Sequence, residues 1–430
     1  MTDDTSSATN AATSPATSTT TAAATATGHT RALWLVLLAA AGTFAMTMGV
    51  RQSMGLFVGD INTHTALGLG TVSLAFGVAQ LWWGLTQPLA GIVADRWGPG
   101  RMLVIGVLLV GLGTVLTPHV SSMGGLILVI AVLSAGGAGM AGPSVLMAAT
   151  TRLVSPARRG FATGVVNAGG SFGQFVFAPL AQAMSNASGW VSSLHSLGLI
   201  VLLALPAAWV LRGLPRQSAA MNAAPAQSTR EAIAQAWQHP GYRLLATGFF
   251  VCGFHVAFLA THLPGVVASC GLPPQVGAWA IAVLGLFNIV GSVGIGLAMG
   301  FQGGRWRLKS MLSLLYMVRA VAVLLFLLAP KTVEVMLLFA AVMGVTFLST
   351  VPLTAGLVVR FFGPAHMATL FGLVMVTHQM GGFLGAWLGG KVFEATGSFD
   401  AVWVADIALA LAAALIHLPI KEARPTLQPA

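Results

Sequence analysis

Long apolar runs recur along the chain and are separated by short polar breaks. These runs approach or exceed the roughly 20 residues that a helix needs to cross the hydrocarbon layer of a bilayer. Six spans are expected in the first half, near residues 33–58, 70–94, 102–117, 124–148, 161–185 and 191–211. Six more are expected near 242–268, 276–300, 310–329, 332–358, 367–390 and 399–419. The pattern predicts an all-α membrane protein with twelve transmembrane helices in two six-helix bundles.

The composition agrees with this prediction, because 56% of the residues are hydrophobic and only 7% are charged. A soluble domain carries about 25% charged residues, so this chain lacks the charges for a water-facing surface. The net charge of +10 does not indicate nucleic-acid binding, because Lys and Arg occur singly between apolar runs and form no basic stripe. No nucleophile with a base at suitable spacing and no phosphate-binding glycine loop occurs, so an enzyme is not expected.

Polar segments divide the chain into domains. Residues 1–30 are rich in Ala, Thr and Ser, and we expect a disordered N-terminal tail there. The two bundles are expected over 31–212 and 242–420, with a cytoplasmic linker over 213–241 and a C-terminal tail over 421–430. The first apolar run is too long for a signal-peptide core, so it is taken as the first span.

The basic residues indicate the orientation of the spans. If the N-terminus is cytoplasmic, sixteen of the 20 Lys and Arg residues fall in the termini or in connections on that side. Only Lys331 and Lys391 fall in connections on the opposite side. Because cytoplasmic loops carry the excess of Lys and Arg, both termini are expected to be cytoplasmic.

The two halves of the sequence repeat each other at a constant offset of 208 residues. Arg152, Pro156, Ala157 and Gly164 correspond in this way to Arg360, Pro364, Ala365 and Gly372. Two parallel repeats are one plan of secondary transporters, which bind solute near the membrane midplane between the repeats. The repeat therefore supports the prediction of six spans in each half.

A short loop, GIVADRWGPGR, follows the second expected span. Its pattern of glycines, an Asp-Arg pair and a further basic residue consists of Gly91, Asp95, Arg96, Gly98 and Arg101. The pattern resembles the signature loop between the second and third helices of the major facilitator superfamily, although two positions that are more often basic are Pro and Gly here. Asp95 could accept hydrogen bonds from a helix N-terminus or an arginine and form a conformational latch, or it could only solvate the turn. The corresponding loop of the second half, GGRWRLKS, has no acid, so any latch should be asymmetric.

Across nearly the whole helical region the chain resembles bacterial members near the oxalate/formate antiporter and monocarboxylate porter branches of that superfamily. The segments VRQSMGLF, AQLWWGLTQPLAG, RRGFATGVVNAGGSFGQ, FLSTVPLT and THQMGGFLGAWLGG carry the resemblance. It implies the major facilitator fold, a monomer in the bacterial inner membrane, alternating access, and no cofactor. The Asp-Arg pair that resembling eukaryotic carriers place in their eighth helix is absent here, where Asn288 is the strong polar side chain.

Two arginines fall within expected spans. Charged side chains there are costly and usually face a cavity, which makes each one a candidate site. Arg51 lies in the outer third of the first span, where its guanidinium could hold a carboxylate through two parallel hydrogen bonds or extend to the outer headgroups. Arg319 lies near the middle of the ninth span, where it could bind solute or be tied to backbone carbonyls or a neighbouring helix.

Several uncharged polar groups at mid-depth complete the expected substrate-binding set. His255 and His262 are seven residues apart and share a helix face, and His378 and Gln379 lie midway along the eleventh span. Together with Asn288, they are expected to contact solute, and a histidine could relay a proton. They could equally be neutral groups that join helices. No metal-ligand spacing accompanies them, so no metal site is expected.

The scarcity of acids favours an anionic solute over a cationic one. Apart from Asp95, only Asp406 enters a span, and no carboxylate is obviously placed to carry protons. We therefore expect a secondary transporter for a small organic anion, a monocarboxylate, by proton symport or anion antiport. One alternative is efflux of amphipathic or drug-like molecules. Another, from a different class, is a membrane solute sensor that does not transport.

Overall fold

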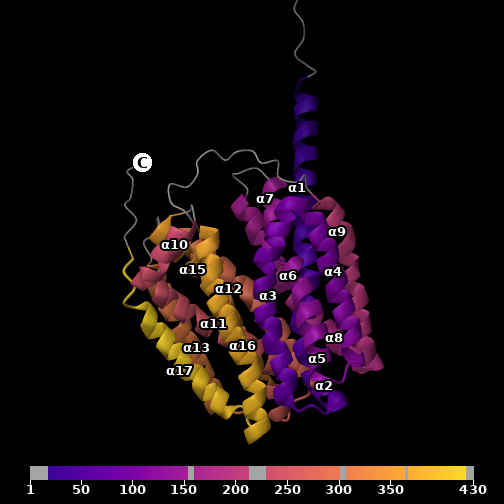
Figure 1. Ribbon diagram of the computed structural model, residues 1–430, viewed down its shortest axis with the longest axis vertical. Helices are drawn as coiled ribbons and strands as arrows, with labels where there is room; N and C mark the ends of the chain where they lie inside the picture. The colour runs from indigo at the N-terminus through magenta and orange to yellow at the C-terminus, as the bar shows by residue number, and fades with distance from the viewer. Residues whose placement is uncertain (1–17, 154–158, 213–228, 301–306, 364–366, 423–430) are drawn as a thin grey trace, which may run out of the picture.

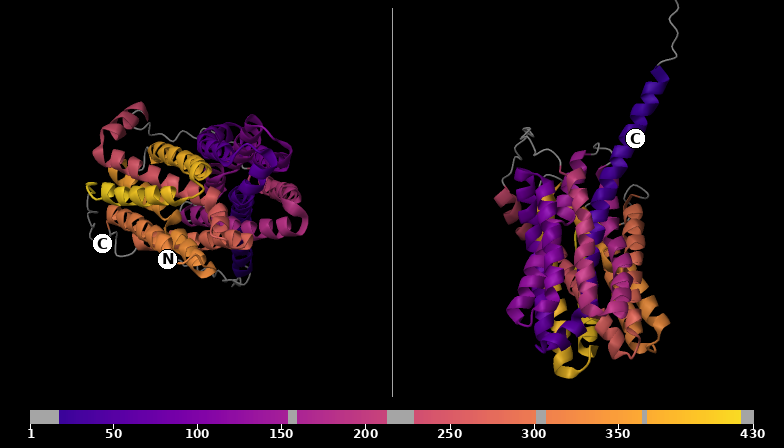
Figure 2. Two further views of the ribbon diagram at one scale, coloured as in Figure 1. Left: turned by 90° about the horizontal axis from the view of Figure 1, so that it is seen from below. Right: turned by 90° about the vertical axis from the view of Figure 1, so that its right-hand side faces the viewer.

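The computed structural model describes residues 18–153, 159–212, 229–300, 307–363 and 367–422 (Figure 1). Regular structure in these residues is helical throughout. The helices of the first half of the chain gather on one side and those of the second half on the other, as the left-hand view in Figure 2 also shows. The prediction of an all-α protein built from two helical bundles is confirmed.

The helices of the first half follow the expected order. They are α1 (Ser18–Ser53), η1 (Met54–Phe57), α2 (Val58–Thr65), α3 (Leu69–Trp97), α4 (Pro99–Leu116), η2 (Thr117–His119), α5 (Met123–Leu126), η3 (Ile127–Ala135), α6 (Gly136–Met140), α7 (Pro143–Leu153), α8 (Arg159–Ile200), η5 (Val201–Ala204) and α9 (Leu205–Val210). The long helix α8 bends at Gly189, whose φ of 84° lies in the left-handed region that glycine tolerates. α8 therefore consists of two helices that meet at Gly189 and make two crossings.

The second half contains eight helices in the described residues. They are α10 (Thr229–Gln238), α11 (Pro240–Ser269), α12 (Pro274–Gly300), α13 (Leu308–Leu328), α14 (Val333–Phe347), α15 (Thr350–Phe362), α16 (Met367–Thr396) and α17 (Asp400–His417). α14 and α15 form one interrupted crossing, because Leu348 leaves helical geometry with φ −106° and ψ 7°. This interruption matters for the site described below.

The described chain contains nine segments that are long and apolar enough to cross a bilayer. One of these, Ala162–Val210, is 49 residues long and holds the two crossings on either side of the bend in α8. α3 and α16 carry more polar side chains but have 29 and 30 residues, which is also sufficient to span. These helices together account for the twelve expected transmembrane helices.

The bundle has two ends, which we name after the helices found there. α10 lies at one end, called the α10 end, and α2 and α5 lie at the other, called the α2 end (Figure 1). The start of α1 projects from the α10 end, and the last described residues of the chain return to it. Two bundles of six crossings each require this arrangement, because an even number of spans returns the chain to the side from which it started.

The halves meet along two pairs of helices, α3 with α16 and α8 with α12. Toward the α2 end these pairs are in close contact. Any side chain added at Gly77 of α3 would collide with Phe383 and Trp387 of α16, and one at Gly390 would collide with Ser73. The α2 end is therefore sealed between the halves.

Toward the α10 end the same helices separate. Gly91 of α3, Gly372 of α16, Gly164 of α8 and Gly294 of α12 have no atom within 4 Å of the position that a side-chain carbon would occupy. Their counterparts deeper in the bundle do, including Gly285 of α12, which faces the α8 backbone. Among the described residues, close contacts between the halves are thus found toward the α2 end and not at these four glycines.

Two expected domain limits differ from the structure. α1 already begins at Ser18, so residues 18–30 are helical where a disordered tail was expected, and residues 1–17 lie outside the described residues. Similarly, α10 occupies part of the expected linker, and the remaining linker residues 213–228 are not described.

Candidate functional site

Arg51 lies at the end of α1, where the chain continues through η1 into α2. Its guanidinium donates a hydrogen bond to the side-chain oxygen of Gln80 on α3 and lies 4.7 Å from the centre of the Trp83 ring. A weaker contact joins it to the sulfur of Met48 at 4.0 Å. In the described part of the chain, no carboxylate lies within ion-pair distance of this guanidinium. Arg51 therefore has polar and aromatic neighbours but no counter-charge.

A cavity adjoins Arg51 between the two halves. Arg51, Phe76, Gln80 and Ser134 line it from the first half, and Ala260 and Thr261 of α11 line it from the second. It contains about 370 Å³ of atom-free space, part of which is open to solvent. Ser134 comes from η3, a nine-residue π-helix, a geometry often found at functional sites. The arrangement suits a small anionic molecule held by a guanidinium beside apolar and hydroxyl groups.

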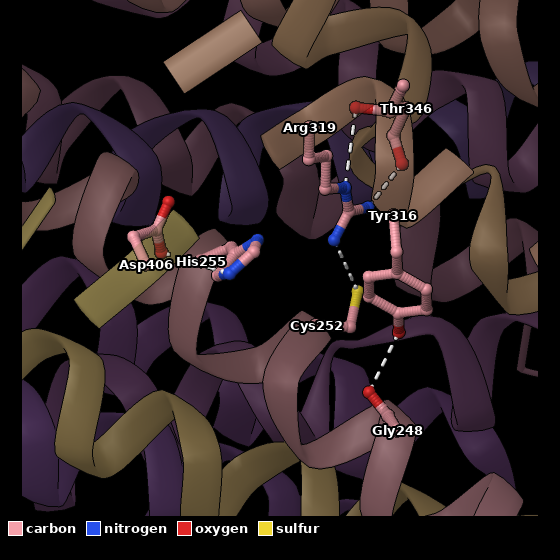
Figure 3. A network of polar contacts seen from close by, with 7 residues as sticks. All are labelled: Gly248, Cys252, His255, Tyr316, Arg319, Thr346 and Asp406. Carbon is pink, nitrogen blue, oxygen red and sulfur yellow. Dashed lines mark hydrogen bonds and ion pairs between the residues drawn. The ribbon is translucent and has the colours of Figure 1, made fainter. Parts of the chain in front are cut away.

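Arg319 has very different surroundings, although it too lies inside the membrane. It is fully buried, and its guanidinium donates hydrogen bonds to the backbone oxygens of Thr346 and Phe347, the latter at 2.7 Å (Figure 3). Nε also donates to the Thr346 hydroxyl at 3.3 Å, and a terminal nitrogen lies 3.5 Å from the sulfur of Cys252. Of the two roles left open by the sequence, the structure shows Arg319 tied to backbone carbonyls.

The break between α14 and α15 explains why an arginine is needed there. The last carbonyls of a helix lack intrahelical donors, and a buried carbonyl without a partner is costly. Arg319 of α13 supplies several donors at this point, and its guanidinium also lies 5.1 Å from the Tyr316 ring centre. This residue closes the end of α14 and does not line the cavity beside Arg51.

His255 and Asp406 form a buried pair in the second half. His255 of α11 is 1% exposed, Asp406 of α17 is also 1% exposed, and Nε2 of the ring lies 3.0 Å from Oδ1 of the carboxylate. Nδ1 of His255 has no hydrogen-bond partner among the described residues. Sequence analysis expected no carboxylate placed to carry protons, and the structure places one directly beside a candidate histidine.

The remaining expected site residues serve contacts between helices. His262 bonds through Nε2 to the Ala386 backbone oxygen at 2.6 Å, so it faces α16 while His255 faces α17. His378 is buried beside Phe249, with ring centroids 4.8 Å apart. Neither α11 histidine lines the cavity beside Arg51, where α11 contributes only Ala260 and Thr261.

Asn288 and Gln379 lie where the two halves meet. Asn288 donates to the Ser171 hydroxyl of α8 at 2.9 Å and accepts from the Leu348 amide at 3.1 Å. Gln379 is buried and packs against Gly84 of α3. These two amides therefore sit on the contact surface that must rearrange if the halves move.

The expected latch lies at the α10 end, where α3 passes into α4. Gly98 turns the chain with φ 88°, and Arg101 is exposed in the first turn of α4. Gly91 faces open space. The side chains of Asp95 and Arg96 lie outside the described residues, so the latch stays a prediction.

The second half supplies its own acid from an unexpected place. Glu422, beyond the last helix, accepts hydrogen bonds from the backbone amides of Leu308 and Lys309 at 3.1 and 3.2 Å, at the start of α13. It also pairs with Arg360 at the end of α15. The loop GGRWRLKS lacks an acid, and Glu422 provides one for the helix that follows this loop.

Comparison with known proteins identifies the family to which the chain belongs. The family model described as Major Facilitator Superfamily matches residues 33–298, which is more than half of the chain. The chain belongs to the major facilitator superfamily. It is a secondary transporter and not an enzyme, as expected from the sequence.

Relatives in the superfamily cover almost the whole chain. Monocarboxylate transporter 13 of Rattus norvegicus is 28% identical over 401 residues, which is 90% of this chain and 89% of the relative. The oxalate:formate antiporter of Oxalobacter formigenes is 24% identical over 370 residues, which is 85% of this chain and 86% of the relative. The resemblance to these branches is confirmed at the level of distant relatives.

Solved structures of the superfamily confirm the fold. A mutant of the nucleoside transporter NupG superimposes with a TM-score of 0.71 at 16% identity, covering 90% of this chain and 99% of that one. A bacterial homologue of the lysosomal transporter Spinster, inward-facing and occupied, gives 0.69 at 14% identity, with 91% and 98% covered. At such identities the likeness concerns the fold alone.

Two partners of site residues in this superfamily member were missed by sequence reasoning. Gln80 was not among the expected site residues, and its bond to Arg51 depends on how α3 packs against α1. Asp406 was noted as an acid entering a span, but its pairing with His255 joins residues far apart in the sequence. The sequence did offer one signal, an acid within an expected span, because a charged side chain buried in the membrane requires a partner.

Proposed function

We propose that the chain carries small organic anions, specifically monocarboxylates, across the bacterial inner membrane by alternating access. Movement occurs by proton symport or by anion antiport. Arg51 holds the carboxylate in the cavity between the halves, and the polar groups around it orient the solute. The α10 end is cytoplasmic, so both termini face the cytoplasm and the structure is open inward.

The observation that supports this proposal is the unpaired charge of Arg51. A guanidinium at a cavity inside the membrane, without a carboxylate partner among the described residues, creates a place where an anion is more stable than elsewhere in the bundle. Two parallel hydrogen bonds from one guanidinium match the geometry of a carboxylate. The relatives named for monocarboxylate, oxalate and formate transport add support from a second direction.

Alternating access follows from where the halves touch. They are sealed around Gly77 and Gly390 and apart around Gly91 and Gly372. Rocking of one half against the other would open the first contact and close the second, with Arg51 and Ala260 on opposite walls of the cavity. The Gly91, Asp95, Arg96, Gly98 and Arg101 loop acts in this scheme as the latch at the α10 end, on the first half.

Efflux of amphipathic molecules is the second candidate. Phe76 and Met54 give the cavity an apolar component, which such molecules would use. A cavity without an exposed guanidinium would favour efflux, whereas Arg51 lines this one. The carboxylate transporter is therefore the function that the site supports better.

The proposal is tested with purified protein in proteoliposomes. Uptake and exchange of radiolabelled formate, acetate, lactate and oxalate are measured for the wild type and for Arg51→Lys. We expect at least one of these anions to be transported, and the lysine variant to lose about tenfold or more of the rate, because an ammonium cannot donate the paired bonds of a guanidinium. Thermal unfolding of the variant should stay within about 2 °C of the wild type, because Arg51 has no buried counter-charge to lose.

Two results would contradict the proposal. Unchanged transport by Arg51→Lys removes Arg51 from the site. A thermal-shift screen in which cationic or drug-like molecules stabilise the wild type and none of the four anions does would favour efflux instead.

A further inference from the structure

The polar groups buried in the second half extend beyond the anion site and include one acid. We propose that His255 and Asp406 form a proton-binding site, and that one proton bound there crosses the membrane with each anion held at Arg51. This inference rests on the proposed function, which leaves symport and antiport open, and selects symport. Figure 3 shows the pair beside Arg319, with the His255 ring on the side of Asp406 that faces the guanidinium.

The atoms of the pair define where the proton binds. Nε2 of His255 lies 3.0 Å from Oδ1 of Asp406, but the contact lacks hydrogen-bond geometry, and neither atom has a hydrogen-bond partner among the described residues. Nδ1 of the ring is likewise buried without a partner there. An arriving proton binds the ring and gives an imidazolium whose charge is balanced by the Asp406 carboxylate.

The helices packed around the pair carry further buried titratable or charged groups. They are Cys252 on α11, Tyr316 and Arg319 on α13, His378 on α16 and His417 on α17. Arg319 and Tyr316 are bound elsewhere, to the α14 carbonyls and to the Gly248 oxygen at 2.9 Å. His417 bonds to the Ala413 oxygen at 2.6 Å. Among the buried residues that the structure describes, Asp406 is the sole acid, so its interactions with His255 and Arg319 dominate the charge of the cluster.

Charge balance shows why this pair suits an anion carrier. With a neutral His255, Asp406 and Arg319 cancel, and the cluster has no net charge. Binding of one proton makes the cluster +1, while binding of a monocarboxylate at Arg51 adds −1. The empty and the fully loaded protein therefore carry the same charge within the membrane. The membrane potential then acts equally on the rocking of both forms, because neither carries a charge that the other lacks.

Helix α11 connects the proton to the anion. One side of this helix presents His255 to α17, and another side presents Ala260 and Thr261 to the cavity beside Arg51. The same helix is packed tightly on α16, where a side chain at Gly253 would collide with the His378 backbone. α16 in turn meets α3 of the first half. A change of charge at His255 thus acts on a helix that touches both the anion cavity and the contact between halves.

The test separates accumulation from exchange in proteoliposomes. An inward-directed proton gradient, with acid outside, drives accumulation of labelled lactate, formate or acetate, and exchange is measured at equal pH against the same unlabelled anion inside. We expect His255→Gln and Asp406→Asn to lose accumulation by about tenfold or more while exchange stays within about threefold, because exchange returns the loaded carrier without releasing a proton. His417→Gln is the matched control, a buried histidine on the same helix as Asp406, and it should accumulate as the wild type does.

The remaining outcomes distinguish failure of the proposed proton site from failure of the proposed anion transport. Variants that accumulate normally, or folded variants that lose accumulation and exchange equally, overturn the proton site. A wild type that exchanges anions but never accumulates them under a pH difference also overturns it while sparing anion transport. A wild type that neither accumulates nor exchanges any of the anions defeats the proposed function itself. The proton site is then judged by infrared difference spectra between pH 5 and pH 8, in which a histidine signal must disappear in His255→Gln.

Discussion

Arg51 and Arg319 both place a guanidinium inside the membrane, one in each half. They differ in how many hydrogen bonds each guanidinium makes with the rest of the protein. Arg319 donates to two backbone oxygens, approaches a cysteine sulfur and is fully buried. Arg51 bonds to one amide side chain, lies over an indole ring and borders a cavity. A buried arginine with all its donors engaged holds the protein together, whereas one with spare donors at a cavity is available for a solute.

The comparison also shows that depth in the membrane does not identify a binding residue. Arg319 lies deeper than Arg51 by its place in its helix, yet the interrupted crossing of α14 and α15 takes its hydrogen bonds. The useful question is which partners the rest of the chain supplies. Three predictions test this difference, beginning with the largest expected effect.

The first prediction concerns the arginine that is fully engaged. Arg319→Met should lower the free energy of unfolding by about 3 kcal/mol or more, because the Thr346 and Phe347 oxygens are left buried without donors. Thermal unfolding in detergent and the folded yield from gel filtration measure the loss. Arg51→Met, the matched variant in the other half, should unfold close to the wild-type temperature. Equal stability of the two variants would break the comparison.

The second prediction gives the guanidinium of Arg51 a charged partner within the protein. Gln80→Glu places a carboxylate at the position that already accepts from Arg51, and the resulting ion pair competes with the solute. The anion concentration for half-maximal uptake should rise by about tenfold or more. Gln80→Met removes the hydrogen bond without adding charge and should change that concentration much less. If both variants behave alike, the free charge of Arg51 is not what binds the anion.

The third prediction addresses the aromatic ring beside Arg51. Trp83→Leu removes a cation–π contact worth about 1 kcal/mol, so the half-saturation concentration should change by about fivefold. Trp82→Leu, one position along α3, serves as the control because Trp82 is not stacked on the guanidinium. Measured uptake curves that shift equally for both variants would show that the effect comes from packing of α3.

Much of the fold could be predicted from the sequence, because crossing a bilayer imposes a length and an apolarity that repeat twelve times. The same assignment of spans also predicted how far along their helices Arg51, His255 and Arg319 lie. Their partners could not be predicted, because spacing along one helix defines a face but not the helix that covers it. His255 and His262 were expected to share a face, and the structure gives them different neighbours on α17 and α16.

The interruptions of helices were the second feature that could not be predicted from the sequence. The apolar pattern predicted one continuous span over 332–358, and the break at Leu348 leaves no trace in hydropathy. That break creates the carbonyls that engage Arg319, so the role of the arginine could not be decided before the break was known. The contact of Gln80 with Arg51 likewise depends on how two helices of one half pack.

Glu422 has a consequence for how the protein is made. The loop of the first half carries its acid, Asp95, within itself, so that half holds all its own parts once its six helices have left the ribosome. The second half depends on a carboxylate that follows its last helix and reaches back to the start of α13. The contacts at the start of α13 are therefore completed by a residue that is translated after the last span.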